Sequence, residues 1–314
     1  MQNNNEFYNS LTVSSSKFID PQIQSLFRES NILISGLGSI GNPIAMAAIR
    51  AGAENLTITD PDVVSLENLP RQQYSIDQIG VNKALATKNN ALSINPYAII
   101  NAFVDGTTKA NVYDQVNDAR IIIDAIDIRS LGEIWELHQH ASLLRKPVLT
   151  GYDLAGTAMI EVYRYDTEEI PALRGELTLD KILEFNNVKK AFDANEISES
   201  EYIDYVYDAF RGPIRPLLVP VEQLHELLNR KADDSRTYQL GTTSIALSAL
   251  AVETMIRLLS EEKIKRTIHM DLPSLVRKRN PSFISRILLL LKVLKVINNR
   301  SRKVGDILTN LNIH

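Results

Sequence analysis

A glycine-rich turn between a strand and a helix constrains the fold of this chain more than any other sequence feature. Residues 36–41 read Gly-Leu-Gly-Ser-Ile-Gly, between an apolar strand predicted over Asn31–Ser35 and an alanine-rich helix predicted over Asn42–Ala51. In such a turn the first glycine permits the bend, the second admits a phosphate, and the third lets the helix pack closely. The helix N-terminus adds positive partial charge, so the turn predicts a nucleotide site. The three glycines are Gly36, Gly38 and Gly41.

Short apolar segments alternate with helix-like ones along the first half of the chain. This alternation is typical of a parallel sheet with right-handed helical crossovers. We therefore predict an α/β fold with a Rossmann-like, mostly parallel sheet flanked by helices. The other predicted strands are Leu56–Asp60, Tyr97–Val104, Ile121–Asp127 and Pro147–Thr150, and the other predicted helices are Pro21–Glu29, Lys83–Ala91, Leu131–Leu144 and Gly241–Leu259.

Composition changes divide the chain into five predicted parts. Residues 166–237 contain 16 acidic and 9 basic side chains and are helix-prone, which indicates an insertion or lid. The predicted parts are a helical arm (1–30), a nucleotide-binding domain (31–165), the helical insertion or crossover lid (166–237), a return to the core (238–275) and a basic amphipathic segment (276–314).

The C-terminal segment is strongly basic, with 12 Lys and Arg and one acid, Asp271, over residues 263–303. Its residues 283–297 form an apolar helix with lysines, for which we weigh two interpretations. It is either a core or dimer-interface helix whose lysines extend to water, or a peripheral contact with an anionic membrane. The first is the commoner use of such a helix.

The 314 residues include no cysteine, which excludes disulfides, iron–sulfur clusters, zinc ribbons and a cysteine nucleophile. The net charge of −4 gives no overall basic excess for nucleic acid. The polar first residues do not resemble a secretory leader, and no uninterrupted apolar run reaches the roughly 18 residues of a spanning helix. We therefore expect a cytoplasmic protein.

Charged residues that follow the glycine turn distinguish ATP from NAD. Asp60 comes at the end of the next predicted strand, where a carboxylate can bind ribose hydroxyls. Arg71 and Lys83 add two cations, and Asp127 ends a further predicted strand. A triphosphate needs cations for its phosphates and a carboxylate for Mg²⁺, whereas a nicotinamide needs apolar walls. The pattern favours Mg²⁺ and ATP.

Together these motifs resemble the ThiF/MoeB/HesA family of adenylating enzymes, bacterial relatives of ubiquitin-activating enzymes. The resemblance covers roughly residues 25–165 and is weaker at 241–259. The matching motifs are the glycine turn, a D-x-D-x-V-x-x-x-N-L-x-R-Q run from Asp60 to Gln72, a G-x-x-K that ends at Lys83, and a D-x-x-D formed by Asp124 and Asp127.

The resemblance implies a reaction of a substrate carboxylate with ATP that gives an acyl-adenylate and pyrophosphate. It also implies a homodimer, because the family's nucleotide sites lie near a dimer interface, and a peptide or small carrier protein as substrate. The implied nucleotide ligands are Gly36, Gly38 and Gly41 for the phosphates, Asp60 for the ribose, Asn68 and Arg71 for the triphosphate with Gln72 in support, and Lys83 for phosphate charge during attack. Arg71, Lys83 and Asp127 are the implied catalytic residues, with Asp127 holding Mg²⁺ and Asp124 orienting the strand end.

The chain departs from the family's pattern in four places. It lacks the two Cys-x-x-Cys pairs that hold zinc and any thiol in residues 166–237, which excludes a thioester on this chain. The stretch Phe7–Leu11 lacks the family's N-terminal arginines, for which Arg28 is a substitute to consider, and Ile128 stands where asparagine is common. Two alternatives to an active enzyme therefore stay open. One is a degenerate subunit that binds nucleotide and peptide, and the other, less favoured, is an NAD-dependent oxidoreductase.

Overall fold

The computed structural model of the chain describes residues 3–209, 211–231, 234 and 236–310. Its centre is a seven-stranded sheet with the strand order β3-β2-β1-β4-β5-β6-β7. The first five strands in this order are parallel, and β6 and β7 are antiparallel to their neighbours. The strands are β1 Asn31–Ser35, β2 Asn55–Thr59, β3 Ile99–Phe103, β4 Ile121–Asp124, β5 Val148–Leu154, β6 Thr157–Tyr163 and β7 Thr267–Asp271. The predicted Rossmann-like α/β fold is confirmed.

Helices cover both faces of the sheet. Successive residues of a strand point to opposite sides, and because both sets are apolar here, each face needs a helical layer to bury it. In β1, Ile32 and Ile34 pack in the cluster that holds α2, α3, α4 and α10, whereas Leu33 packs in the cluster of α5 and α6. The helices of these layers are α2 Pro21–Glu29, α3 Gly41–Arg50, α4 Lys83–Ile94, α10 Gly241–Leu259, α5 Val112–Asp118 and α6 Leu131–Leu143. Helix α1, Asn4–Thr12, precedes these layers in the chain. Two short 3₁₀ turns, Leu66–Asn68 and Ile76–Gln78, lie between β2 and α4.

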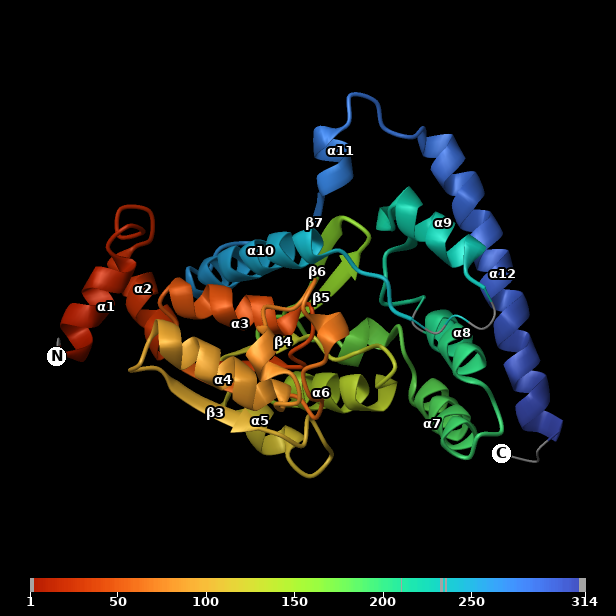
Figure 1. Cartoon of the computed structure of the whole chain (residues 1–314), viewed down its shortest axis with the longest axis horizontal. Coiled ribbons are helices and arrows are strands. Elements are labelled where there is room, and N and C mark those ends of the chain that lie inside the picture. The colour runs from red at the N-terminus through yellow and green to blue at the C-terminus, as the bar shows by residue number, and fades with distance from the viewer. Residues whose placement is uncertain (1–2, 210, 232–233, 235, 311–314) are drawn as a thin grey trace.

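The insertion and the C-terminal helix form one unit beside the sheet (Figure 1). The insertion contains α7 Leu179–Asp193, α8 Glu199–Ala209, α9 Val221–Asn229 and 3₁₀ turns at Ala172–Gly175 and Pro216–Leu218, while α11 Leu272–Val276 and α12 Phe283–Asn310 follow β7. One face of α12 packs on α8 and α9 through Leu290, Val293 and Ile297. This face of α12 is therefore part of a hydrophobic core, as the core-helix interpretation of residues 283–297 expects.

Helix α10 is long and apolar enough to cross a membrane, but 61% of its most apolar window is buried in the fold. It packs on α3 and on β5 and β6 as a core helix of the sheet.

Several element boundaries differ from the predicted ones for local reasons. Strand β4 ends at Asp124, so Asp127 lies three residues beyond it in a loop and the predicted strand end at Asp127 is wrong. Helix α5 has seven residues and mixed polarity, which gave no clear periodic signal. Strand β7 is only partly buried, so it lacks the apolar run of the central strands.

Candidate active site

The glycine turn joins β1 to α3, and two of its three glycines are required sterically. Gly36 has a φ of +89°, and a Cβ there would lie 2.3 Å from the Ala125 carbonyl oxygen. A Cβ at Gly41 would lie 1.8 Å from the Gly36 carbonyl oxygen. At Gly38 the nearest atom to a Cβ would be Gln72 Nε2 at 3.8 Å, which is ordinary contact. Two glycines thus close the turn, and Gly38 leaves its main chain open to a ligand.

A cavity of about 860 Å³ opens at the carboxyl ends of the parallel strands. Open α/β sheets bind their ligands at this edge. Of the nine residues that the sequence assigns to the site, Gly41 does not line the cavity, since its place is behind the turn in the packing of α3. The cavity brings together the other eight, which are Gly36, Gly38, Asp60, Asn68, Arg71, Gln72, Lys83 and Asp127.

Asp60 ties the glycine turn to the loop after β2. Its two carboxylate oxygens accept hydrogen bonds from the main-chain N–H groups of Leu37 at 2.6 Å and Asp62 at 2.9 Å. Burial raises the pKa of Asp60, against the opposing effect of the nearby Lys83 ammonium. Asp60 therefore organises the turn in this structure, and its contact with ribose stays a prediction.

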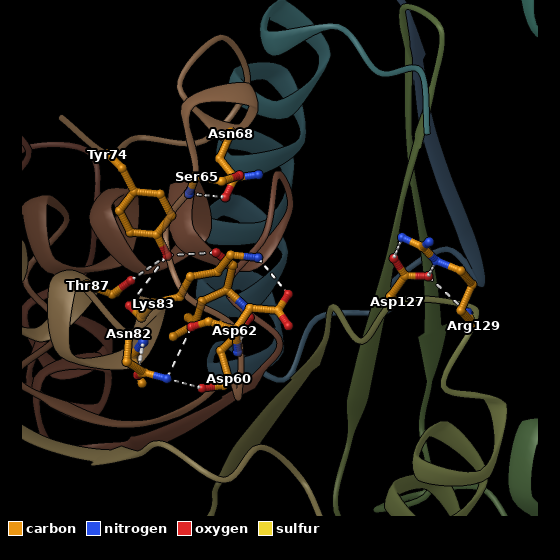
Figure 2. Close-up of polar contacts among 12 residues, drawn as sticks. Asp60, Asp62, Ser65, Asn68, Tyr74, Asn82, Lys83, Thr87, Asp127 and Arg129 are labelled. Atoms are coloured by element: carbon orange, nitrogen blue, oxygen red, sulfur yellow. Dashed lines mark hydrogen bonds and ion pairs between the residues drawn. The ribbon is translucent and has the colours of Figure 1, made fainter. Parts of the chain in front are cut away.

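Lys83 is a buried cation at the first position of α4. The side chain of Asn82 caps this helix, and Asp62 Oδ2 lies 2.8 Å from Lys83 Nζ (Figure 2). The Lys83 side chain is 8% exposed, but that of Asp62 is 66% exposed. A buried ammonium with one solvated partner can exchange that partner for a phosphate oxygen at modest cost.

Arg71 and the amides beside it form a second polar group in the cavity. Arg71 donates from Nη1 to the Glu67 carbonyl oxygen at 2.7 Å and from Nε to Gln239 Oε1 at 3.1 Å. Asn68 Oδ1 accepts from the Ser65 N–H at 3.0 Å and so closes the turn before Arg71 (Figure 2). Gln72 is buried, and its Oε1 has no hydrogen-bond partner among the described residues.

Asp127 lies apart from the Asp60 and Lys83 group and pairs with Arg129, as Figure 2 shows. Arg129 donates to the Asp127 carboxylate from Nη2 at 3.1 Å and from Nε at 3.2 Å, and the Asp127 side chain is 50% exposed. Within the part of the chain that the structure describes, no group of three or more His, Cys, Asp or Glu is placed to hold a metal ion. Asp127 is thus a single carboxylate, which suits Mg²⁺ when phosphates and water supply the other ligands.

A buried network at the edge of the cavity holds the end of β4, and no local sequence signal predicts it. His138 Nε2 lies 3.1 Å from Asp124 Oδ2, and the Thr150 hydroxyl donates to the same oxygen at 3.1 Å. Asp124 Oδ1 accepts from the Ile126 N–H at 3.3 Å, so Asp124 makes the orienting contacts expected of it. Tyr165 lies 2.9 Å from His138 Nδ1 and completes the network.

A sequence model described as ThiF family matches residues 11–282 of the chain. The chain belongs to the ThiF family.

Other similarities agree with this membership. The sulfur carrier protein ThiS adenylyltransferase of Bacillus subtilis is 35% identical over 112 residues, which cover 35% of this chain and 33% of that protein. Among solved structures, PaaA aligns with 89% of this chain and 82% of its own at a TM-score of 0.57 and 17% identity. The tRNA N6-threonylcarbamoyladenosine dehydratase TcdA of E. coli aligns with 83% of this chain and 98% of its own, at a TM-score of 0.56 and 15% identity. At these identities the structures support the fold, and the chain spans about a third of the length of the curated relatives it matches first.

In this ThiF-family chain Arg28, the substitute considered for the family's N-terminal arginines, makes its contacts away from the cavity. Arg28 Nε lies 2.6 Å from Glu54 Oε2, and its guanidinium stacks on the ring of Tyr8 at 4.0 Å. Tyr8 in turn donates to the Gly52 carbonyl oxygen at 2.9 Å. Arg28 therefore fastens α1 and α2 to the end of α3, which argues against its substitution for the family's N-terminal arginines.

Proposed function

We propose that this chain binds ATP with Mg²⁺ in the cavity and adenylates a carboxylate of a peptide or small carrier protein. The observation that carries the proposal is that the glycine turn, Arg71, Lys83 and Asp127 all line one cavity at the carboxyl ends of the strands. The ThiS adenylyltransferase relative and the structure of TcdA in complex with ATP support it.

The reaction needs positioning and charge neutralisation more than proton transfer. A carboxylate oxygen of the substrate attacks the α-phosphorus, the bond from this phosphorus to the bridging oxygen breaks, and pyrophosphate leaves with the electron pair. The carboxylate is already ionised at neutral pH, so no general base is required. Lys83 exchanges Asp62 for a phosphate oxygen, and Arg71 binds the triphosphate, which lowers the barrier by electrostatic stabilisation. Mg²⁺, held by Asp127, would neutralise further phosphate charge.

We propose that the adenylate is used without a thioester on this chain. The sequence has no cysteine, so the activated acyl group has no thiol of the protein to which it can transfer. An amine, a sulfur donor or an internal nucleophile of the substrate would then attack the adenylate directly, with AMP as the leaving group. This chemistry suits the biosynthesis of a peptide natural product or a cofactor. We also propose that the protein is a cytoplasmic homodimer.

A degenerate binding subunit is the alternative that a specific observation favours. Arg28 is paired with Glu54, and residues 7–11 contain no arginine, so neither supplies the cation that the family's N-terminal arginines would bring to a triphosphate. Such a subunit would bind nucleotide and peptide but would not catalyse adenylation of the peptide. Family membership and the cations of the cavity argue against the NAD-dependent oxidoreductase.

ATP–pyrophosphate exchange tests adenylation directly. The full chain is incubated with labelled pyrophosphate, ATP, Mg²⁺ and a small protein or peptide encoded beside its gene. We expect exchange that depends on the substrate and falls at least about 100-fold in Lys83→Ala and Asp127→Asn. Asp118→Asn, the same change at an exposed position of α5, serves as the control. Robust exchange in both site variants would refute the residue roles, and ATP binding without exchange would support the degenerate subunit.

We further propose that the free face of α12 contacts an anionic membrane. Four exposed apolar side chains follow this face beside the exposed Lys292 and Lys295. The apolar residues are Phe283, Ile284, Leu288 and Leu291. We expect co-sedimentation with phosphatidylglycerol vesicles that Leu288→Asp abolishes and that Leu143→Asp, at an exposed apolar site of α6, does not. Equal binding by both variants, or to neutral vesicles, would contradict the contact.

A further inference from the structure

One side-chain oxygen joins the glycine turn to Arg71. Gln239 lies in the extended segment that leads into α10, 200 residues after Ser39 of the turn. Its Oε1 accepts a hydrogen bond from the Ser39 hydroxyl at 2.9 Å and another from Arg71 Nε at 3.1 Å. All three residues line the cavity. A single acceptor is therefore held between a buried hydroxyl and a guanidinium, inside the proposed nucleotide site.

The surroundings of this oxygen favour an anion over a neutral amide. A guanidinium already makes a charge-assisted hydrogen bond to a neutral oxygen, and an ionised oxygen adds Coulomb attraction between the two opposite charges. Ser39 also lies just before α3, whose first turn carries no side-chain cap and whose dipole favours negative charge. Gln239 thus supplies a weak ligand at a point where the protein offers two donors and positive potential.

We propose that the position of Gln239 Oε1 is a phosphate-oxygen subsite, which the Gln239 side chain occupies until a polyphosphate displaces it. The proposal rests on the proposed function, in which the polyphosphate is the triphosphate of ATP. It makes Gln239 an internal competitor of the ligand, because its side-chain oxygen takes the hydrogen bonds of Ser39 and Arg71 that a phosphate oxygen would otherwise accept.

The packing around Gln239 indicates which part moves. A Cβ at Gly241 would lie 2.3 Å from the Pro70 carbonyl oxygen and 3.3 Å from Arg71 Cα, so the start of α10 is fixed against this main chain. Arg71 also keeps its bond to the Glu67 carbonyl oxygen, which does not depend on Gln239. The exchange therefore needs a rotation of the Gln239 side chain, and α10 and the guanidinium can stay in place.

Equilibrium binding of ATP and of inorganic tripolyphosphate to the full chain tests the subsite. Gln239→Ala removes the competitor, so we expect both dissociation constants to fall about two- to tenfold. Gln239→Glu places a carboxylate on Ser39 and Arg71, so both should rise at least about tenfold. Gln139→Glu makes the same change at an exposed position of α6 outside the cavity lining and should alter them by less than about twofold. The circular dichroism spectrum of each variant verifies that it is folded.

The outcomes separate this subsite from the proposed function. Gln239→Glu with wild-type affinity, or Gln239→Ala with weaker binding, would overturn the subsite even where pyrophosphate exchange is robust. If tripolyphosphate binding follows the expected order and no exchange occurs with any substrate, the subsite stands and adenylation fails. If neither ligand binds the wild-type chain, both proposals are overturned.

Discussion

Asp153 places an ionisable group with unusual surroundings in the cavity wall, and its replacement tests the electrostatics of the site. It lies near the end of β5, is 7% exposed and accepts a hydrogen bond from the Ser244 hydroxyl at 3.1 Å through Oδ2. Its Oδ1 is buried without a hydrogen-bond partner in the described part of the chain. Burial raises the pKa of Asp153 from 3.8 to about 6, against the opposing hydrogen bond from Ser244.

The raised pKa sets both the sign and the size of the effect. Because the folded state holds the Asp153 proton more tightly than the unfolded state, folding stability falls as the pH rises from about 4 to about 6. Above pH 6 both states are ionised, and the full cost of the buried charge is present. A pKa of about 6 in place of 3.8 corresponds to roughly 3 kcal/mol.

Asp153→Asn removes this charge and keeps an oxygen that can accept from Ser244. We expect the variant to be more stable than wild type by up to about 3 kcal/mol at pH 7.5, or roughly 4 °C in Tm for a chain of this size. At pH 4.5 the difference should fall to about 1 kcal/mol, because Asp153 is then protonated in the folded state while the unfolded-state carboxyl, with a pKa of 3.8, is still mostly ionised. Urea and thermal unfolding at both pH values measure it, with Asp118→Asn as the exposed control. A variant less stable than wild type at pH 7.5, or a gain that is equal at both pH values, would refute the reasoning.

Three further predictions concern the turn, the cation and the buried network. Gly41→Ala should unfold the chain or destabilise it by more than about 3 kcal/mol, since its Cβ would meet a main-chain oxygen at 1.8 Å, whereas Gly38→Ala should fold and bind ATP at least about tenfold more weakly. Thermal melts and ATP titrations distinguish the two, and equal stability would contradict the steric roles. Lys83→Ala should weaken ATP binding at least about tenfold in the same titration, while Lys88→Ala on the same helix should not, and equal losses would indicate a general charge effect. His138→Leu should lower the free energy of unfolding by about 2–3 kcal/mol in urea, because it leaves the buried Asp124 carboxylate short of a donor. His138→Gln should recover part of this loss. An unchanged urea midpoint in His138→Leu would rule out the hydrogen bond.

The element order of the α/β half was predictable because its signals are local. Parallel strands buried on both faces need near-continuous apolar runs, and the glycine turn needs glycine at fixed spacing. Helix α5 and strands β6 and β7 are absent from the predicted elements. Helix α5 is short and β7 is only partly buried, whereas β6 is buried throughout and follows β5 after a two-residue turn.

The sequence by itself determined the Rossmann-like fold, the ThiF resemblance, the absence of cysteine and eight of the residues that line one cavity. Each of these depends on residue types and on their spacing over short distances, and both can be read directly from the sequence. Only the tertiary structure decided that Gln239 bridges Ser39 and Arg71, that His138 holds Asp124, and that α12 packs on the insertion. The Gln239 bridge and the packing of α12 join segments more than 60 residues apart, and His138 reaches Asp124 across the turn from β4 into α6. Such pairings are set by the geometry of the packed layers, for which the linear sequence carries no direct signal.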